Sequence, residues 1–307
     1  MRRILDHLLD TLIVLLGVSA LVFSLLALIP GDPVDVVLGE SAQAADREAM
    51  RIALGLDRSW PVRLGDYYVG LLTADLGDSL VQRRPVVALI AERLPATLTL
   101  AAAAFFLVVT LAIPLGLAAA WHRGRWPDRL AQAIALMGIS IPNFWLGPLL
   151  VLLFSITLGW TPVSGNEAPG SLVLPALTLG LSMIAITTRM LRSSLLEVVS
   201  MPYIQTARCK GLSEHQVIWR HALPNALLPT LTVMGLQLSS LLAGAVITEV
   251  VFAWPGIGSL LIDAIRQRDY PVIQGVVLFI ALTYVVINRA TDLLVGVLDP
   301  RVREAMQ

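Results

Sequence analysis

Long stretches of apolar and neutral residues alternate along the chain with shorter polar segments. Stretches of 19 or more residues without Asp, Glu, Lys, Arg or His cover residues 11–31, 94–121, 130–166, 168–188, 222–248 and 270–288. About 20 helical residues cross the roughly 30 Å hydrocarbon core of a bilayer, so each stretch is long enough to span a membrane. The segment from Leu98 to Ala120 does not alternate between apolar and polar positions as a barrel strand does. The pattern predicts an all-α polytopic membrane protein with six transmembrane helices.

The composition argues against an ordinary soluble domain. Of the 307 residues, 56% are hydrophobic and 14% are charged. Lys and Arg together number 22, as do Asp and Glu, so the net charge of zero gives no reason to expect a nucleic-acid partner. The single cysteine, Cys209, excludes a disulfide within the chain.

Basic residues indicate the orientation, because short loops rich in Lys and Arg stay in the cytoplasm. With the N-terminus inside, the inner segments contain Arg2, Arg3, Arg123, Arg125, Arg129, Arg189, Arg192, Arg208, Lys210, Arg220, Arg301 and Arg303. The short outer connections contain only Arg266 and Arg268. Both termini are therefore predicted to be cytoplasmic. The first stretch, 11–31, is too long for the apolar core of a signal peptide, so we expect an uncleaved span.

The segment 30–95 is the largest one predicted outside the membrane. Residues 44–54 favour a helix that Gly55 ends, and Trp60 begins a second helical stretch that runs through Leu71. We expect a small extracytoplasmic cap of two short helices. Both a structural lid over the bundle and a docking surface for a partner are compatible with it.

The cytoplasmic segment 191–228 has the most specific local pattern. Met201–Lys210 can form a short helix that Gly211 ends in a left-handed conformation. Ser213 and Gln216 have the spacing of a capping box, and the helix that they begin is expected to stop at about His221, before Leu223-Pro224. Two short helices that project from a membrane bundle indicate an adaptor for another protein.

This segment resembles the EAA loop of binding-protein-dependent ABC importer permeases. Their consensus is Glu-Ala-Ala, three residues, Gly, nine residues, Ile, one residue and Leu-Pro. Here Gln205-Thr206-Ala207, Gly211 and His221-Ala222-Leu223-Pro224 keep that spacing, although Gln205, Thr206 and His221 differ from the consensus residues. The stretch Tyr203–Leu212 is similar to the version found in the peptide, opine and nickel branch.

The resemblance extends over almost the whole chain. Further motifs similar to the dipeptide type of permease, the first of the branch's two paired permeases, lie at 54–57, 75–79, 94–98, 161–165, 189–194, 252–258 and 268–274. The resemblance implies a type I ABC importer permease in the bacterial inner membrane that forms half of a pathway for short peptides by alternating access. It also implies a second homologous permease chain in a heterodimer, two cytoplasmic ATPase chains that bind ATP and Mg, and an extracytoplasmic solute-binding protein.

These expectations divide the chain into segments. They are the N-terminus with the first span (1–29), the cap segment (30–95), the domain of spans two to six (96–298), the coupling loop within it (191–228) and a cytoplasmic tail (299–307).

The resemblance assigns coupling to the ATPase to one set of loop residues. They are Tyr203, Gln205, Ala207, Arg208, Lys210, Gly211, Leu223 and Pro224. We expect Ala207, Gly211 and Leu223 to form the contact core, because small or apolar residues allow close docking. Arg208, Lys210 and Arg220 would supply charge at its rim.

Polar residues inside the predicted spans are candidates for the translocation path. They are Asn143, Ser182, Thr187, Gln237, Ser240 and Glu249. Such residues also serve as interhelical hydrogen-bond partners. Pro142 is expected to kink the third span beside Asn143. Glu249 can either line the outer mouth and meet a substrate ammonium group or pair with an arginine of a neighbouring subunit.

The sequence contains no motif for catalysis or energy conversion. The only lysine, Lys210, is followed by glycine and not by the Ser or Thr of a phosphate-binding loop, and neither His-Glu-x-x-His nor Gly-x-Ser-x-Gly occurs. An ion-coupled secondary transporter, the alternative from another class, would be expected to carry ionisable groups at mid-span. We therefore predict a transport subunit that is not an enzyme and has no cofactor or metal of its own. Short peptides are the expected substrate, with glutathione, opines and nickel chelates as alternatives.

Overall fold

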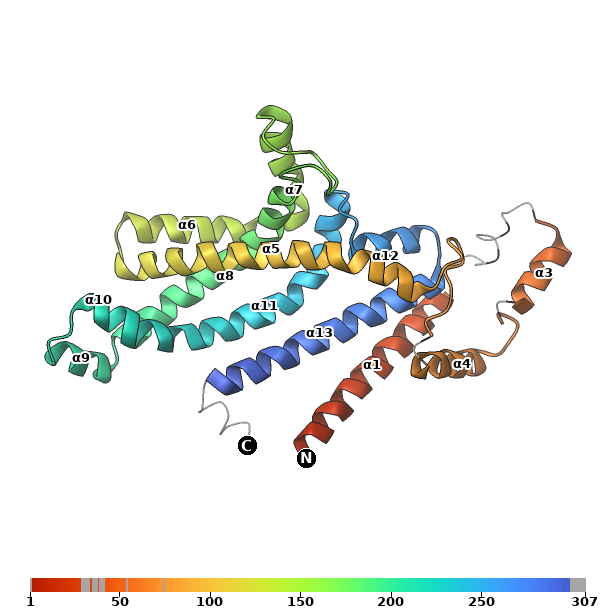
Figure 1. Ribbon diagram of the computed structural model, residues 1–307, viewed down its shortest axis with the longest axis horizontal. Helices are drawn as coiled ribbons and strands as arrows, with labels where there is room; N and C mark the ends of the chain where they lie inside the picture. The colour runs from red at the N-terminus through yellow and green to blue at the C-terminus, as the bar shows by residue number, and fades with distance from the viewer. Residues whose placement is uncertain are drawn as a thin grey trace. The chain divides into compact units, whose positions relative to one another are not determined.

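The computed structural model describes residues 2–28, 34, 38, 42–53, 55–73 and 75–298. Within these residues the protein is almost entirely helical (Figure 1). It divides into two compact units, the first of Met1–Thr97 with Pro255–Val285 and the second of Leu98–Trp254 with Val286–Gln307. Two long helices, α5 (Val86–Trp121) and α13 (Tyr270–Leu298), contribute to both. The predicted tail, 299–307, lies outside the described residues.

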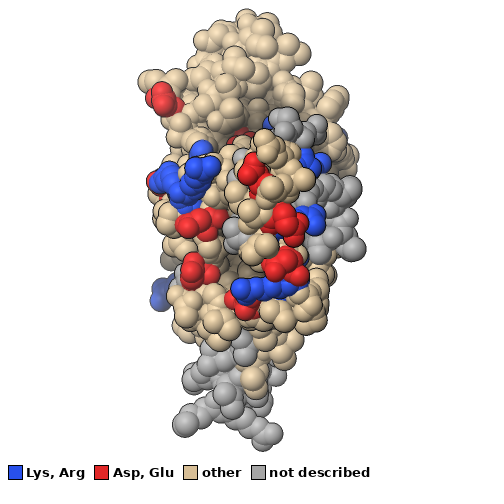
Figure 2. All heavy atoms as spheres, turned by 90° about the vertical axis from the view of Figure 1, so that its right-hand side faces the viewer, with Lys and Arg blue, Asp and Glu red and all other residues tan. Residues whose placement is uncertain are grey.

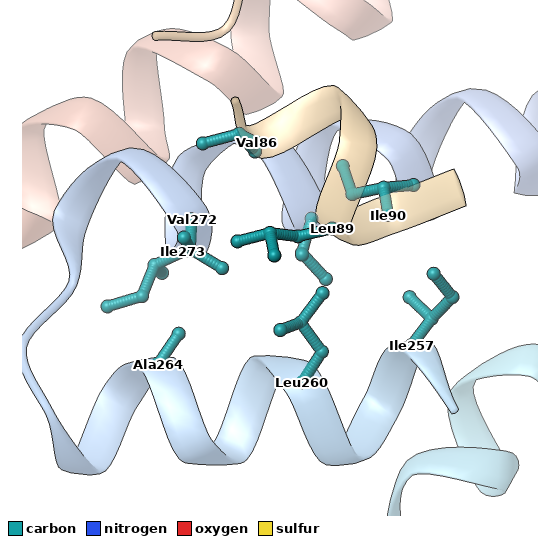
Figure 3. Close-up of a cluster of buried hydrophobic side chains, with 9 residues drawn as sticks. Val86, Leu89, Ile90, Ile257, Leu260, Ala264, Val272 and Ile273 are labelled. Atoms are coloured by element: carbon teal, nitrogen blue, oxygen red, sulfur yellow. The ribbon is translucent and has the colours of Figure 1, made fainter. Parts of the chain in front are cut away.

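The first unit is built around an apolar cluster from three helices. In addition to the starts of α5 and α13, it contains α1 (Arg2–Leu28), α3 (Ala44–Ala53), α4 (Trp60–Leu72) and α12 (Ile257–Arg266). The buried cluster consists of Val86, Leu89 and Ile90 of α5, Ile257, Leu260 and Ala264 of α12, and Val272, Ile273 and Val276 of α13 (Figure 3). Spacings of three and four residues put each group on one face of its helix, so the three faces meet.

A buried carboxylate ties a loop to the start of α13. Asp269 is 3% exposed, and its Oδ2 accepts a 2.5 Å hydrogen bond from Ser79 Oγ. The backbone N–H of Leu80 donates to Oδ1 at 3.1 Å. These bonds satisfy a carboxylate that would otherwise be costly to bury.

The two predicted cap helices are confirmed as α3 and α4. Gly55 follows α3 with φ 65°, the left-handed conformation expected of a residue that ends a helix. The next helix, α4, packs on α1, because the ring of Phe23 lies 5.5 Å from that of Tyr67 and 6.1 Å from that of Trp60. Burial raises the pKa of Tyr67 to about 12.

Charged side chains of both signs intermix on the face of the molecule that carries α3 and α4 (Figure 2). The ion pair between Arg58 Nη1 and Asp66 Oδ2, 2.9 Å apart, belongs to this segment, and both side chains are more than half exposed. Exposed pairs of this kind contribute at most about 1 kcal/mol, so this pair does little to hold the cap in place.

The second unit contains the remaining helices. They are α6 (Trp126–Ser140), α7 (Asn143–Leu150), the π-helix η1 (Val151–Thr157), α8 (Val173–Val199), α9 (Pro202–Cys209), α10 (Glu214–Gln216), the π-helix η2 (Val217–Ala222) and α11 (Leu223–Val251). Packing against α6, α7 and α11 makes α8 the central helix of the unit. Close approach depends on small residues, since a Cβ added to Gly138 of α6 would lie 2.9 Å from both Ala185 Cβ and Leu181 O of α8.

The described residues contain three to five candidate spans. Val86–Trp121, Val173–Val199 and Tyr270–Leu294 are each long and apolar enough to cross a membrane. Two bent pairs add up to two more, Trp126–Ser140 with Asn143–Thr157 and Glu214–Leu241 with Ala245–Val251. The first predicted span forms the helix α1, and within it the shorter apolar stretch Ile13–Leu25 stands out. Six spans and the placement of the termini stay predictions.

Three predicted helix boundaries differ from the structure. The run 130–166 is not one kinked helix, because α6 and the α7–η1 segment meet at 109°. Ile141 (ψ 117°) and Pro142 (ψ 139°) are both extended, as expected of a proline and the residue before it when a helix breaks.

The other two differences concern where a helix ends and where another begins. The helix that begins after Ser213 does not stop before Leu223-Pro224 but runs through η2 into α11. Pro224 lies at the junction of η2 and α11, inside this continuous helix, and it has no N–H to donate to the preceding turn. The second long helix begins at Val86, before the predicted boundary at 95/96, because charged residues such as Glu92 extend a helix beyond its apolar part.

Candidate functional site

The predicted coupling loop (residues 191–228) comprises the end of α8, α9, a glycine turn and the helix that runs from α10 through η2 into the start of α11. Met201 precedes α9 in an extended conformation, and Pro202 opens the helix in its first turn. Gly211 follows with φ 81°, and its N–H donates to Arg208 O at 2.9 Å. The N–H of Leu212 donates to Ala207 O at 3.4 Å. The predicted short helix and its left-handed glycine stop are confirmed.

The predicted capping box at the start of α10 is also confirmed. The N–H of Gln216 donates to Ser213 Oγ at 3.3 Å, and the N–H of Ser213 donates to Gln216 Oε1 at 3.1 Å. Two backbone donors that a helix start leaves open are thereby satisfied. The direction in which α10 leaves the turn is set by local sequence.

An ion pair links the two sides of the turn. Arg208 Nε and Nη2 donate to Glu214 Oε1 and Oε2 at 2.8 and 3.1 Å, in the bidentate geometry of an Arg–carboxylate pair. The hydrogen bond to Glu214 raises the pKa of Arg208. The charge of Arg208 is thus engaged inside the loop, whereas Lys210 and Arg220 are exposed.

The apolar residues of the loop face the chain's own core. Ala207 and Leu223 are 8% and 7% exposed and belong to a buried cluster with Ile204, Leu191 and Val217. This differs from the sequence prediction, in which Ala207 and Leu223 formed the contact core for a partner. Residues three or four apart on a short helix share a face, and here that face covers the end of α8.

Among the loop residues predicted to couple to the ATPase, the exposed ones are Tyr203, Gln205, Lys210, Gly211 and Pro224, and the neighbouring Thr206 and Cys209 are exposed as well. Tyr203 is 40% exposed and its hydroxyl donates to His221 O at 3.3 Å, which ties α9 to η2. Partial burial raises the pKa of Tyr203.

Two of the predicted path residues meet between α8 and α11. Gln237 Nε2 donates to Thr187 Oγ1 at 3.1 Å, and Thr187 is fully buried. Gln237 Oε1 and the neighbouring Thr188 Oγ1 are buried without a hydrogen-bond partner among the described residues. A buried acceptor left open in this way favours a polar ligand or water.

The other path candidates differ in burial. Ser182 and Asn143 are half-buried, Asn143 at the start of α7. Ser240 is exposed and its hydroxyl donates to Leu236 O at 3.2 Å in its own helix. Glu249 is completely buried in α11, so its side chain does not face an open mouth in this conformation.

The chain matches two family models that together cover nearly its whole length. Residues 112–304 match the model of the binding-protein-dependent transport system inner membrane component, and residues 1–101 match that of the N-terminal part of such membrane components. The chain belongs to this family. This permease is therefore a multi-pass inner-membrane protein with a transport role.

Relatives of this permease resemble it from end to end. The glutathione transport system permease protein GsiC of Salmonella typhimurium (strain LT2) is 43% identical over 303 residues, which are 99% of each chain. A putative peptide transport system permease protein of Brucella abortus (strain 2308) is 44% identical over 308 residues, 98% of each chain.

Solved structures support the fold. The methionine ABC transporter MetNI in inward-facing conformations has a chain with a TM-score of 0.59 and 20% identity, covering 69% of this permease and 97% of that chain. An amino acid ABC transporter crystallised with histidines gives a TM-score of 0.54 at 17% identity, covering 70% and 94%. The predicted type I importer fold class is thus supported at the level of architecture.

Sequence reasoning missed the ion pair between α6 and α8. Arg192 Nε and Nη2 donate to Asp128 Oδ1 and Oδ2 at 2.6 and 2.9 Å. Asp128, 1% exposed, also accepts from the N–H of Gly124 at 2.8 Å and from Gln132 Nε2 at 2.7 Å. Arg192 was interpreted only as one of the basic residues of the inner face, and Asp128 was not singled out. The available signal for this ion pair was an acidic residue, Asp128, in the first turn of one helix of this permease and a basic residue, Arg192, toward the end of another.

The described part of this permease shows no group of three or more His, Cys, Asp or Glu side chains arranged to hold a metal ion.

Proposed function

We propose that this permease is one of two homologous transmembrane subunits of an ATP-driven importer that carries short peptides, glutathione among them, into the cell. The similarity over 98–99% of the chain to a glutathione permease and a putative peptide permease carries the proposal. This permease crosses the membrane six times and has both termini in the cytoplasm. Two separate ATPase chains and an extracytoplasmic solute-binding protein complete the complex.

The coupling loop would transmit the ATPase motion. The turn at Gly211 and the capping box at Ser213 support this role, because they present two helices at a defined angle. We assign the partner-facing surface to the exposed residues Gln205, Lys210 and Gly211, since Ala207 and Leu223 are buried within the chain. When ATP binding closes the two ATPase chains, this surface would move and rock the spans between two open states.

Transport by the reconstituted complex tests the proposal. Proteoliposomes that hold this permease, the second permease and both ATPase chains, with the binding protein outside, should take up labelled tri-alanine or glutathione only when ATP is enclosed. Uptake driven by an ion gradient without ATP would indicate a secondary transporter instead. Accumulation of a nickel chelate with no peptide uptake would reassign the substrate. Complexes without the binding protein serve as the control.

A further inference from the structure

A cavity of about 450 Å³ lies within the second unit among α6, α8 and α11. It is lined by Gln132, Ile139, Ile186, Arg189, Met190, Arg192, Ser193 and Val233. Its size falls within the range of about 300–1,000 Å³ that is usual for small-ligand sites. Ile186, Arg189, Met190 and Ser193 are spaced by three and four residues, so one face of α8 forms most of the wall.

The charge of the cavity is unbalanced. Two arginines and no acidic residue line it. Arg192 is held by Asp128 in a bidentate pair, so its charge is compensated. Arg189, one turn earlier on α8, is exposed and forms no ion pair or hydrogen bond with any described residue. The guanidinium of Arg189 is therefore the positive charge in the cavity that is available to bind an anionic ligand.

Polar groups continue from this cavity along α8 and α11. Gln237 lies one helical turn after Val233, which lines the cavity, and it holds Thr187 by the 3.1 Å hydrogen bond. The open acceptor Gln237 Oε1 is able to receive an N–H group. The guanidinium of Arg189 can bind the carboxylate of an extended short peptide. Gln237 Oε1, farther along the helices, can accept a hydrogen bond from one of its N–H groups.

We infer that Arg189 binds the carboxylate of the transported peptide in this cavity, an inference that rests on the proposed function. The planar guanidinium donates two parallel hydrogen bonds to a carboxylate. The pair of Asp128 and Arg192 positions α8 for this contact and keeps Arg192 from competing for the ligand. The site takes free peptide acids and disfavours the corresponding amides.

Chemical protection of the wild-type complex tests the contact directly. The full complex in nanodiscs is treated with phenylglyoxal, which modifies exposed arginines, and modification is followed by mass spectrometry at Arg189 and Arg123. Arg123 is the matched control, because it is exposed and lies outside the cavity in the turn after α5. Millimolar tri-alanine should slow modification of Arg189 several-fold, tri-alanine amide should not, and Arg123 should react equally throughout.

Two outcomes of this experiment overturn the inference. One is an Arg189 that reacts at the same rate with and without tri-alanine. The other is protection of Arg189 in the absence of peptide in nanodiscs of anionic lipid but not in nanodiscs of neutral lipid. That result would mean that a lipid phosphate binds the Arg189 guanidinium.

Uptake by variants gives a second test. The binding protein contributes its own selectivity, so the ratio of tri-alanine to tri-alanine amide uptake in each variant is divided by the wild-type ratio. Arg189→Gln should lower this ratio roughly tenfold, as expected when a charge-assisted hydrogen bond is lost. Arg189→Lys should retain most of it, and Arg123→Gln should leave it unchanged.

The results separate the inference from the proposed function. Wild-type complexes that take up neither peptide would remove the proposed function and the inference with it. Normal wild-type uptake with an unchanged ratio in Arg189→Gln would remove only the inference.

Discussion

Gly211 occupies a backbone conformation that other residues adopt only at a cost. Its φ is 81°, and a Cβ added there would meet no atom within 4 Å. The constraint is therefore local strain and not a clash, worth about 1–2 kcal/mol for a residue with a side chain. Since the N–H of Gly211 also closes the end of α9, strain at this residue acts on the angle between α9 and α10.

Replacing Gly211 by valine should impair coupling without preventing insertion. We expect ATPase activity stimulated by substrate and binding protein to fall roughly 5- to 30-fold, the effect of one to two kcal/mol. Gly124→Val is the matched control, because Gly124 has φ 77° and open space around it but lies in the turn between α5 and α6. Equal losses in both variants, measured in reconstituted complexes, would contradict a specific role for Gly211.

Helix α8 illustrates how elements in this protein are positioned by close contacts and buried polar pairs. The Asp128–Arg192 pair fixes α6 to α8 near one end. Toward the other end of α6, Gly138 lets the backbones approach so closely that an added Cβ would lie 2.9 Å from Leu181 O. Small residues at such crossings are common between membrane helices, where dispersion forces replace the hydrophobic effect.

Gly138→Ala should therefore destabilise the second unit, by about 1–3 kcal/mol, because a backbone carbonyl cannot move aside as a side chain can. The measurement is thermal unfolding of the purified protein in mild detergent. Gly17→Ala in α1 is the control, since nothing lies within 4 Å of a Cβ there and alanine favours helix by up to about 1 kcal/mol. Similar stabilities for the two variants would contradict this prediction, because they would show that α6 and α8 move apart at little cost to make room for the added methyl group.

At the scale of the whole molecule, orientation in the membrane decides which surface meets which partner. The basic residues predict that the coupling loop is cytoplasmic. Cys209 is the only cysteine in the sequence and is exposed on this loop. The chain thus carries a natural probe of its own topology.

Labelling with a membrane-impermeant maleimide should reach Cys209 in inverted vesicles and leave it unlabelled in intact spheroplasts. Cys209→Ser provides the blank. The double variant Cys209→Ser with Thr73→Cys reverses the expectation, because Thr73 is exposed at the end of α4 in the predicted outer cap. Labelling of Cys209 in spheroplasts would place the loop outside and exclude contact with a cytoplasmic ATPase.

The sequence by itself determined the features that depend on neighbouring residues. Charge-free runs predicted the long helices, Gly55 and Gly211 ended α3 and α9 as expected, and Ser213 with Gln216 formed the capping box. These outcomes rest on helix hydrogen bonding and backbone sterics within a few residues. The spacing of the coupling loop was sufficient to indicate the family, which the comparisons confirm.

Only the tertiary structure decided which side chains meet. It turned Ala207 and Leu223 inward, joined Asp128 to Arg192 across 64 positions, and left Arg189 open beside a cavity. It also showed that the chain continues as helix through Leu223-Pro224 yet breaks at Ile141-Pro142. In each case the deciding contacts come from residues distant in sequence or from the path of the backbone around a proline, and a linear pattern of apolar and polar positions contains neither.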